Sequence, residues 1–212
     1  MYNNILFIDF DGTITSEETL EGTLKRFTPK LLYYWKGAQF KLGILNLSQI
    51  VHYGFSKIPS SRLPDILAYV RSVPIRPGFE DLLKTCKEAG IPVVIISGGL
   101  RPCIREKLDP YKDYLLDIYD LELDTSGPTM VLHSDFEEGD HIMSKVRVME
   151  KFSYKSSMCI GDSFTDFKMA KASDLVFARD RLAKKLAEDG QDFIPWEDFH
   201  DVERVIRERF LP

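Results

Sequence analysis

The sequence predicts an α/β fold, a mostly parallel β-sheet flanked by helices, and three observations lead to this prediction. Four short runs are apolar enough to be strands buried on both faces, as in parallel sheets: Ile5–Ile8, Val93–Ile96, Ser157–Ile160 and Leu175–Ala178. Segments of helical character separate the later runs, which is the pattern of β-α-β units. The chain of 212 residues is long enough for one such core and a small insertion.

Turn and capping residues indicate where the remaining elements lie. Pro77-Gly78 opens a helix that ends near Gly90, where a glycine is suited to the residue after a helix. The runs on either side of Ser126-Gly127-Pro128 predict a β-hairpin within residues 115–132. The other expected helices are Arg101–Leu108, Asp140–Phe152, Thr165–Lys171, Arg181–Glu188 and Asp198–Arg209, and a short extended piece at 192–194 lies between the last two.

A long helical region, residues 16–73, lies between the first two strands and is far longer than an ordinary crossover. We interpret it as a small helical cap inserted into a core formed by residues 1–15 and 74–212. Ser16-Glu17-Glu18 suits a helix start, because acidic side chains stabilise the first turn. We expect four residues to divide the cap into short helices: Pro29, Gly37, Gly43 and Pro59.

The composition favours a globular protein of the cytoplasm. A formal net charge of −5 argues against nucleic acid or an anionic membrane as the main partner. No run reaches the roughly 18 apolar residues of a membrane span, and no export signal is visible. The cysteines are odd in number and lack CxxC spacing, which points to buried, reduced thiols rather than disulfides or a zinc site. They are Cys86, Cys103 and Cys159.

Two carboxylates mark the end of the first strand. Asp9 and Asp11 follow Ile5–Ile8 directly, and Gly12 then lets the chain turn. In parallel sheets, functional groups gather at the carboxyl ends of the strands. Two neighbouring carboxylates repel each other, so the sequence predicts a cation bound between them.

The next strands end in residues of related chemistry. Ser97-Gly98-Gly99 follows the second strand and can cradle an anion at a helix N-terminus, although such a turn also needs glycine for purely structural reasons. Asp162 and Asp166 follow the third strand and can converge on the same cation; the alternative is a capped helix start, with Asp162 or Ser163 as the N-cap. Lys145 precedes that strand and can reach the pocket, or it is one more solvated lysine.

The order and spacing of these residues along the chain resemble those of the haloacid dehalogenase (HAD) superfamily of phosphohydrolases, whose core is a Rossmann-like sheet. Motif one is Asp9-Phe10-Asp11-Gly12-Thr13, motif two Ser97-Gly98-Gly99, motif three Lys145, and motif four Gly161-Asp162 with Asp166. The resemblance implies a Mg²⁺-dependent phosphatase that acts on a small phosphomonoester through an aspartyl-phosphate. It excludes the dehalogenase branch, which lacks the second acid, Asp11.

The resemblance also implies a role for each residue. Asp9 is the expected nucleophile. The expected magnesium ligands are the side chains of Asp9 and Asp162 and the backbone carbonyl of Asp11. The side chain of Asp11 is the expected general acid and base. The expected phosphate-binding groups are Ser97, Gly98, Gly99 and Lys145, with Asp166 and Thr13 in support.

Within the superfamily, Ser97-Gly98-Gly99 and Glu18 resemble the phosphoserine phosphatase group. There the glutamate matching Glu18 contacts the substrate amine; alternatively, Glu18 is only a first-turn acid. The arginine that would clamp the serine carboxylate falls near Val51 or His52, and no arginine occurs between Arg26 and Arg62. Arg101 is a further candidate for contact with an anionic group, or a solvated arginine at a helix start.

Nearly the whole chain resembles the methionine-salvage phosphatases that act on 2-hydroxy-3-keto-5-methylthiopentenyl-1-phosphate. Matching stretches include Asp9 to Thr15, Ile95 to Gly99, Ile160 to Ser163 and Phe177 to Asp180. This chain lacks the cysteine-rich segment that the family carries before Lys145. The alternatives that stay open are a phosphoserine, phosphocholine or phosphoethanolamine phosphatase, a phosphomutase or phosphotransferase, and a non-catalytic binding module.

The cap is unusually aromatic. Its aromatic residues include Tyr33, Tyr34, Trp35 and Phe40. They pack within the cap, line the space for an apolar substrate or form the interface of a homodimer.

Overall fold

The computed structural model describes residues 1–211 and contains one seven-stranded sheet. The strand order is β4-β3-β2-β1-β5-β6-β7, with β1 in the middle. The strands are β1 (Tyr2–Ile8), β2 (Val93–Leu100), β3 (Leu115–Asp124), β4 (Val131–His133), β5 (Tyr154–Gly161), β6 (Leu175–Ala178) and β7 (Ile194–Pro195). Every pairing is parallel except that of β3 with β4, so the predicted mostly parallel sheet and the hairpin are confirmed.

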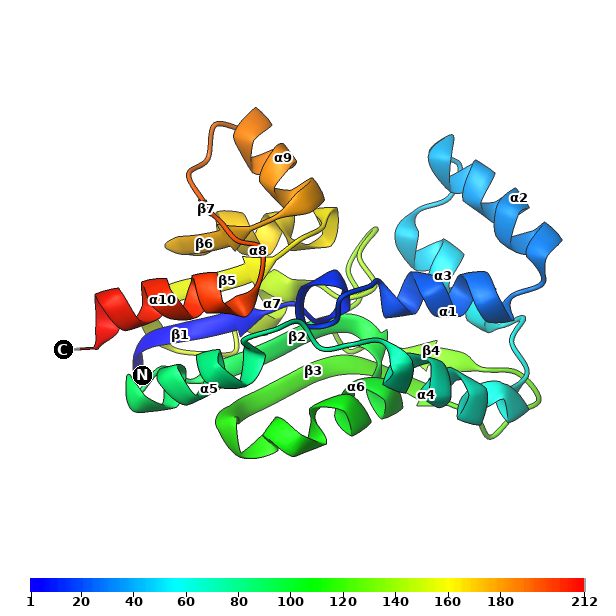
Figure 1. Ribbon diagram of the computed structural model, residues 1–212. Helices are drawn as coiled ribbons and strands as arrows, with labels where there is room; N and C mark the ends of the chain where they lie inside the picture. Colours follow the sequence, from blue (N-terminus) through cyan, green and yellow to red (C-terminus); the bar gives the residue numbers. More distant parts are fainter. Residues whose placement is uncertain (212) are drawn as a thin grey trace.

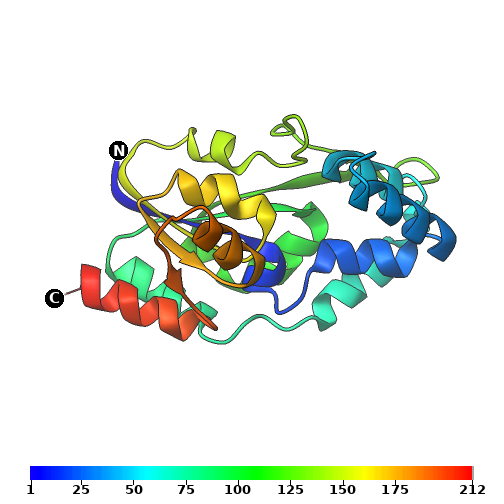
Figure 2. The same cartoon turned by 90° about the horizontal axis from the view of Figure 1, so that it is seen from above.

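Helices cover both faces of the sheet, and the alternation of side chains along β1 shows how (Figures 1 and 2). Leu6 and Ile8 belong to a buried apolar cluster with α5 (Phe79–Glu88), α6 (Arg101–Leu108) and α10 (Phe199–Phe210). Ile5 and Phe7 belong to the cluster on the opposite face, with α7 (Lys145–Met149), α8 (Phe167–Lys171) and α9 (Asp180–Glu188). Because β1 is buried from both sides, an unbroken apolar run is what its position requires.

Four of the five α-helices between β1 and β2 lie beyond the carboxyl end of β1 (Figure 1). They are α1 (Thr19–Phe27), α2 (Lys30–Lys41), α3 (Leu47–Phe55) and α4 (Leu63–Ser72). The two chain segments that lead into and out of this insertion run side by side: Ser16 N donates to Pro74 O at 3.0 Å, and Thr15 bridges Ile75. The bounds 16–73 of the cap stay a prediction, because contacts alone do not show that the insertion is a separate unit.

Three local expectations differ from the structure. Gly37 lies inside α2 rather than dividing it, a placement that costs only about 1 kcal/mol relative to alanine. The helix expected from Asp140 begins only at Lys145, because Glu138 and His141 exchange two backbone hydrogen bonds of 2.9 Å in a turn. Ser97-Gly98-Gly99 lies within β2, which continues to Leu100, and not at a helix N-terminus.

All three cysteines are buried free thiols, as expected. Among residues 1–211, no helix combines the length and the apolar character that crossing a membrane requires.

Candidate active site

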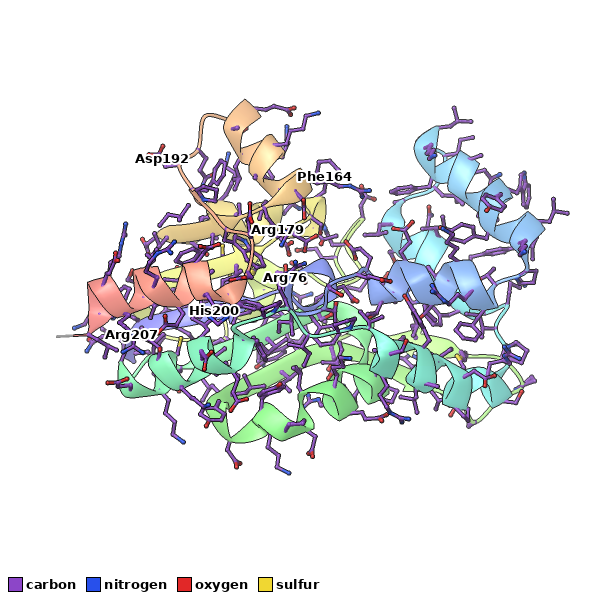
Figure 3. The ribbon with its side chains drawn as sticks, in the orientation of Figure 1. Arg76, Phe164, Arg179, Asp192, His200 and Arg207 are labelled. Atoms are coloured by element: carbon purple, nitrogen blue, oxygen red, sulfur yellow. The ribbon has the colours of Figure 1, made fainter. Side chains whose placement is uncertain are left out.

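Asp9 leaves β1 at the edge where β1, β2 and β5 end. Its backbone N–H donates to Ile160 O of β5 at 3.0 Å, and the chain then makes a single tight turn, η1 (Phe10–Ile14). Gly12 has a φ of +78° in this turn, a conformation that only glycine adopts readily. Arg76, labelled in Figure 3, donates to the carbonyl oxygens of Gly12 (2.7 Å) and Thr13 (3.1 Å) and so fixes the turn.

Three glycines let the carboxylates approach the backbone closely. A Cβ on Gly12 would lie 2.6 Å from Asp162 Oδ2, and one on Gly161 would lie 2.7 Å from Asp166 Cγ. A Cβ on Gly99 would lie 2.8 Å from an oxygen of Asp11. Heavy atoms do not approach this closely, so a side chain at any of the three positions would displace a carboxylate of the site.

Three carboxylates and one ammonium form the centre of the site. Lys145 is only 4% exposed, and its Nζ contacts Asp9 Oδ1 and lies 2.5 Å from Asp166 Oδ1. Oxygens of Asp9, Asp162 and Asp166 all lie within 4.8 Å of one another. The structure therefore brings together four predicted site residues that are far apart in the chain.

The charges of this cluster do not balance. Burial, with the negative charge of Asp166, raises the pKa of Asp9 well above its ordinary value, and it raises the pKa of Asp162 to about 6. Burial opposes charge on Lys145 too, but Asp166 and Asp9 outweigh it and raise the pKa of Lys145. The lysine thus stays charged, and three carboxylates share one cation. A second, divalent cation would relieve this excess of negative charge.

Asp166 is fully engaged, whereas Asp9 and Asp162 are not. Besides Lys145, Asp166 accepts hydrogen bonds from the N–H groups of Asp162 (3.1 Å) and Ser163 (3.0 Å). Asp162 accepts a 2.8 Å hydrogen bond from Thr13 Oγ1 on one oxygen, which leaves its second oxygen for a ligand. Carboxylate oxygens are the donors that Mg²⁺ prefers, so the residues present fit this ion.

Asp11 points to a residue that the sequence did not reveal. Its Oδ1 accepts a 2.8 Å hydrogen bond from the N–H of Thr19 and another from the Thr19 hydroxyl. Burial raises the pKa of Asp11, while the Thr19 bonds act in the opposite direction. Thr19 is the first residue of α1, so the inserted helices hold the side chain of the predicted general acid.

Ser97 and Gly99 lie next to Asp11, because a Cβ on Gly99 would lie 2.8 Å from Asp11 Oδ2 and 3.1 Å from Ser97 Oγ. Ser97 is fully buried in the second half of β2, and Gly99 N donates to its Oγ at 2.9 Å. The register of β2 against β3 shifts between Ile96 and Leu100, so the strand is irregular there. The segment therefore lies in an irregular stretch of β2 rather than at a helix N-terminus.

Two further candidates have different surroundings. Glu18 precedes α1 and faces the site: burial and the charges of Asp11 and Asp162 raise its pKa to about 8. Arg101 instead forms ion pairs with Asp120 (2.8 Å) and Glu122 (3.0 Å) of β3. Its guanidinium is committed to these carboxylates, so the structure gives no support to a substrate role for Arg101.

Comparisons with known proteins find relatives both in sequence and in structure. A family model for haloacid dehalogenase-like hydrolases matches residues 6–171. A 2-hydroxy-3-keto-5-methylthiopentenyl-1-phosphate phosphatase of Microcystis aeruginosa is 40% identical over 206 residues, which are 96% of this chain and 98% of the relative.

Two solved structures share the fold. A HAD family hydrolase of Salmonella enterica serovar Typhi has a TM-score of 0.73 at 16% identity, over 98% of this chain and 73% of that one. The phosphoserine phosphatase of T. onnurineus has a TM-score of 0.69 at 19% identity, over 97% of this chain and 95% of that one.

Proposed function

Because this chain belongs to the haloacid dehalogenase-like hydrolase family and is a phosphatase, we propose that it hydrolyses a small phosphomonoester on Asp9. The observation that carries the proposal is the buried cluster of Asp9, Asp162 and Asp166 around Lys145. Burying four ionisable groups together is costly for a fold, and such clusters are concentrated at functional sites.

The reaction takes two steps at one carboxylate. An oxygen of Asp9 attacks the phosphorus, and the bond between phosphorus and the leaving-group oxygen breaks. Asp11 gives its proton to that leaving oxygen. Asp11 then takes a proton from water, whose oxygen attacks the phosphorus of the aspartyl-phosphate, so that inorganic phosphate leaves and Asp9 is restored.

Lys145 and the segment from Ser97 to Gly99 bind the phosphoryl oxygens in this proposal. Charge spreads over these oxygens as the phosphoryl group transfers, and preorganised donors stabilise that charge most. Asp166 does not react; its two contacts with Lys145 and with the backbone of the Asp162 loop fix the lysine in place. Thr13 fixes Asp162 in the same way.

We propose Mg²⁺ as the cofactor, held by Asp9 and Asp162 with the backbone carbonyl of Asp11. When bound, the ion neutralises the excess of carboxylate charge and so lets a phosphate dianion approach the site.

For the substrate we propose 2-hydroxy-3-keto-5-methylthiopentenyl-1-phosphate, supported by the 40% identity to the relative named for it. Phosphoserine is less well supported, because the positions near the expected arginine clamp hold the buried Val51 and His52, which faces Glu137. Glu18 is our proposed contact for the polar part of the leaving group, since its raised pKa suits a hydrogen bond to an uncharged oxygen.

Asp9→Asn tests the nucleophile with a side chain of nearly the same shape. We expect hydrolysis of p-nitrophenyl phosphate with Mg²⁺ to fall at least about 10³-fold, because an amide oxygen cannot form the phosphoenzyme. The matched control is Asp192→Asn, an exposed aspartate between α9 and β7 (Figure 3). Wild-type turnover in Asp9→Asn, with circular dichroism unchanged, would contradict the proposal.

A panel of phosphorylated metabolites separates the remaining alternatives. It includes the methionine-salvage intermediate, phosphoserine, phosphocholine and phosphoethanolamine, each measured as kcat/KM. Release of inorganic phosphate in proportion to substrate consumed identifies a hydrolase, whereas transfer to a second sugar or alcohol identifies a phosphotransferase. Equal and slow turnover of the whole panel would count against the proposed substrate.

A further inference from the structure

The segment before Lys145 has almost no regular secondary structure to fix its shape. Residues 134–144, which we call the brace segment, connect β4 to α7 and contain no helix or strand of regular length. Lys145 is the first residue of α7, which has only five residues. The position of the Lys145 ammonium therefore depends on what fixes the brace segment.

Inside the brace segment, hydrogen bonds converge on Ser144, the residue before Lys145. Ser144 N donates to Phe136 O at 2.7 Å, and Ser144 Oγ donates to Glu138 Oε2 at 2.7 Å. The Phe136 ring packs edge-on against Tyr119 of β3, with centroids 5.4 Å apart. These contacts give the segment a defined shape, so that fixing one part of it fixes the rest.

The far side of the brace segment is tied to α3, in the inserted helices. Glu137 accepts a hydrogen bond from the hydroxyl of Ser48, a side chain only 4% exposed, and Glu137 Oε2 lies 3.1 Å from His52 Nε2. Asn46, the residue that caps α3, donates to Asp140 Oδ1 at 2.8 Å. Residues about 90 positions apart in the chain are joined at three points.

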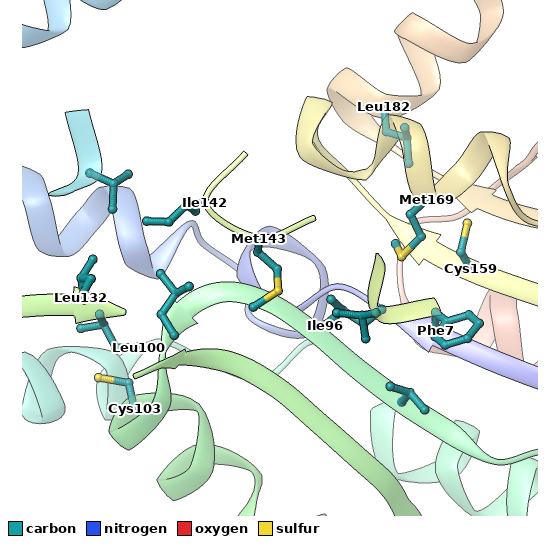
Figure 4. Packing of buried hydrophobic residues seen from close by; sticks show 14 of the residues in the cluster. Phe7, Ile96, Leu100, Cys103, Leu132, Ile142, Met143, Cys159, Met169 and Leu182 are labelled. Atoms are coloured by element: carbon teal, nitrogen blue, oxygen red, sulfur yellow. The ribbon is translucent and has the colours of Figure 1, made fainter. Parts of the chain in front are cut away.

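The brace segment also touches the proposed phosphate-binding segment. A Cβ on Gly98 would lie 3.4 Å from Ile142 Cγ2, so Ile142 lies directly over this glycine. Ile142 and Met143 are buried in the same apolar cluster as Ile96 and Leu100 of β2 (Figure 4). One segment thus contacts the Ser97–Gly99 backbone and ends at the lysine.

We propose that Glu137 is a positioning residue: bound to Ser48 and His52 of α3, it fixes the brace segment and through it Lys145 and Ile142 at the phosphate site. The inference rests on the proposed function, in which Lys145 and Ser97–Gly99 bind the phosphoryl group. Glu137 itself touches neither group. Its effect is on where they lie, and a small displacement of an electrostatic donor costs much of its stabilisation of a transition state.

The test compares Glu137→Ala, Ser48→Ala and the double variant, using p-nitrophenyl phosphate as substrate and orthovanadate as an inhibitor that mimics the transferring phosphoryl group. We expect each single variant to lower kcat/KM by about 5- to 20-fold and to raise the vanadate Ki by a similar factor. The double variant should be no worse than the more damaged single variant, because the two side chains act as one contact. Glu137→Gln should recover activity to within about threefold, since its amide oxygen still accepts from Ser48.

The control is Glu150→Ala, which removes an exposed glutamate just after α7. It should leave kcat/KM and the vanadate Ki unchanged. Effects of Glu137→Ala and Ser48→Ala that multiply, or a vanadate Ki within twofold of wild type in both, would overturn the proposal. If Glu137→Ala does not fold, the result for Ser48→Ala decides the question by itself, because that variant loses only the hydroxyl that donates to Glu137. The outcome is distinguishable from failure of the proposed function, which would show as an active Asp9→Asn.

Discussion

Lys145→Met removes one positive charge from the centre of the site and keeps the length of the side chain. In the wild type, Lys145 contacts Asp9 and Asp166, and all three side chains are at most 6% exposed. Without the ammonium, the buried carboxylates oppose only one another. Removing one partner of a buried ion pair costs about 3–5 kcal/mol. At about 2–4 °C per kcal/mol for a chain of this size, the melting temperature should fall by roughly 6–20 °C.

The loss depends on pH, and its sign follows from the pKa shifts. Burial and Asp166 already raise the pKa of Asp9, and loss of Lys145 raises it further above the unfolded value of about 3.9. A group whose folded pKa lies above its unfolded pKa loses its stabilising contribution as pH rises through the folded value. The deficit of Lys145→Met should therefore be largest at pH 7–8 and shrink as the pH falls towards 5.

The assay is thermal unfolding by circular dichroism between pH 5 and 8 in EDTA, so that no metal ion replaces the missing charge. Lys171→Met is the matched control: its 2.7 Å pair with Asp189 is exposed, and such pairs contribute about 0–1 kcal/mol. It should shift the melting temperature by less than about 3 °C. A Lys145→Met protein with the melting temperature of the wild type at pH 7.5 and an unchanged kcat would refute the electrostatic role assigned to this lysine.

Two further predictions concern Asp11 and the metal. Thr19→Val removes the hydroxyl that donates to Asp11 and keeps the hydrogen bond from the Thr19 N–H. A hydrogen bond to a charged group contributes about 1.5–3 kcal/mol, so kcat should fall roughly 10- to 150-fold. Thr19→Ser, which keeps the hydroxyl, should restore kcat. An unchanged kcat in Thr19→Val would show that Thr19 does not hold Asp11 in its working position. EDTA should abolish phosphatase activity, and MgCl₂ at about 100 times its Kd should raise the wild-type melting temperature by roughly 5–10 °C. The same titration should leave Asp162→Asn unshifted, and an equal shift in that variant would exclude Asp162 as a ligand.

The sequence predicts the strands, their order along the chain and the residues at their ends. This succeeds because buried parallel strands need unbroken apolar runs, and because side chains that follow such strands must meet at one edge of the sheet. Asp9, Asp162 and Asp166 lie together for this reason. Their proximity is a consequence of topology and needs no knowledge of side-chain conformation.

The features that the sequence does not predict depend on contacts between distant segments. Thr19 is an ordinary helix-start threonine in the sequence, and only the turn at Gly12 brings Asp11 back to it. Glu137 and Ser48 become partners only when the insertion lies against the loop before Lys145. The predicted start of α7 is too early because Asp140 is a good helix cap, but its side chain accepts from Asn46 instead.

The central position of β1 also bears on how the chain acquires its shape during synthesis. One edge of β1 pairs with residues 93–95 of β2 and the other with residues 154–160 of β5, so both partners are distant in sequence. The chain must lose the entropy of closing these long loops before strand pairing stabilises it, and this makes folding slow. As the chain leaves the ribosome, β1 lacks its β5 partner until residue 160 has emerged. Shorter nascent chains leave one edge of β1 unpaired and its apolar side chains uncovered, so this stretch is where we expect chaperones to bind the growing polypeptide.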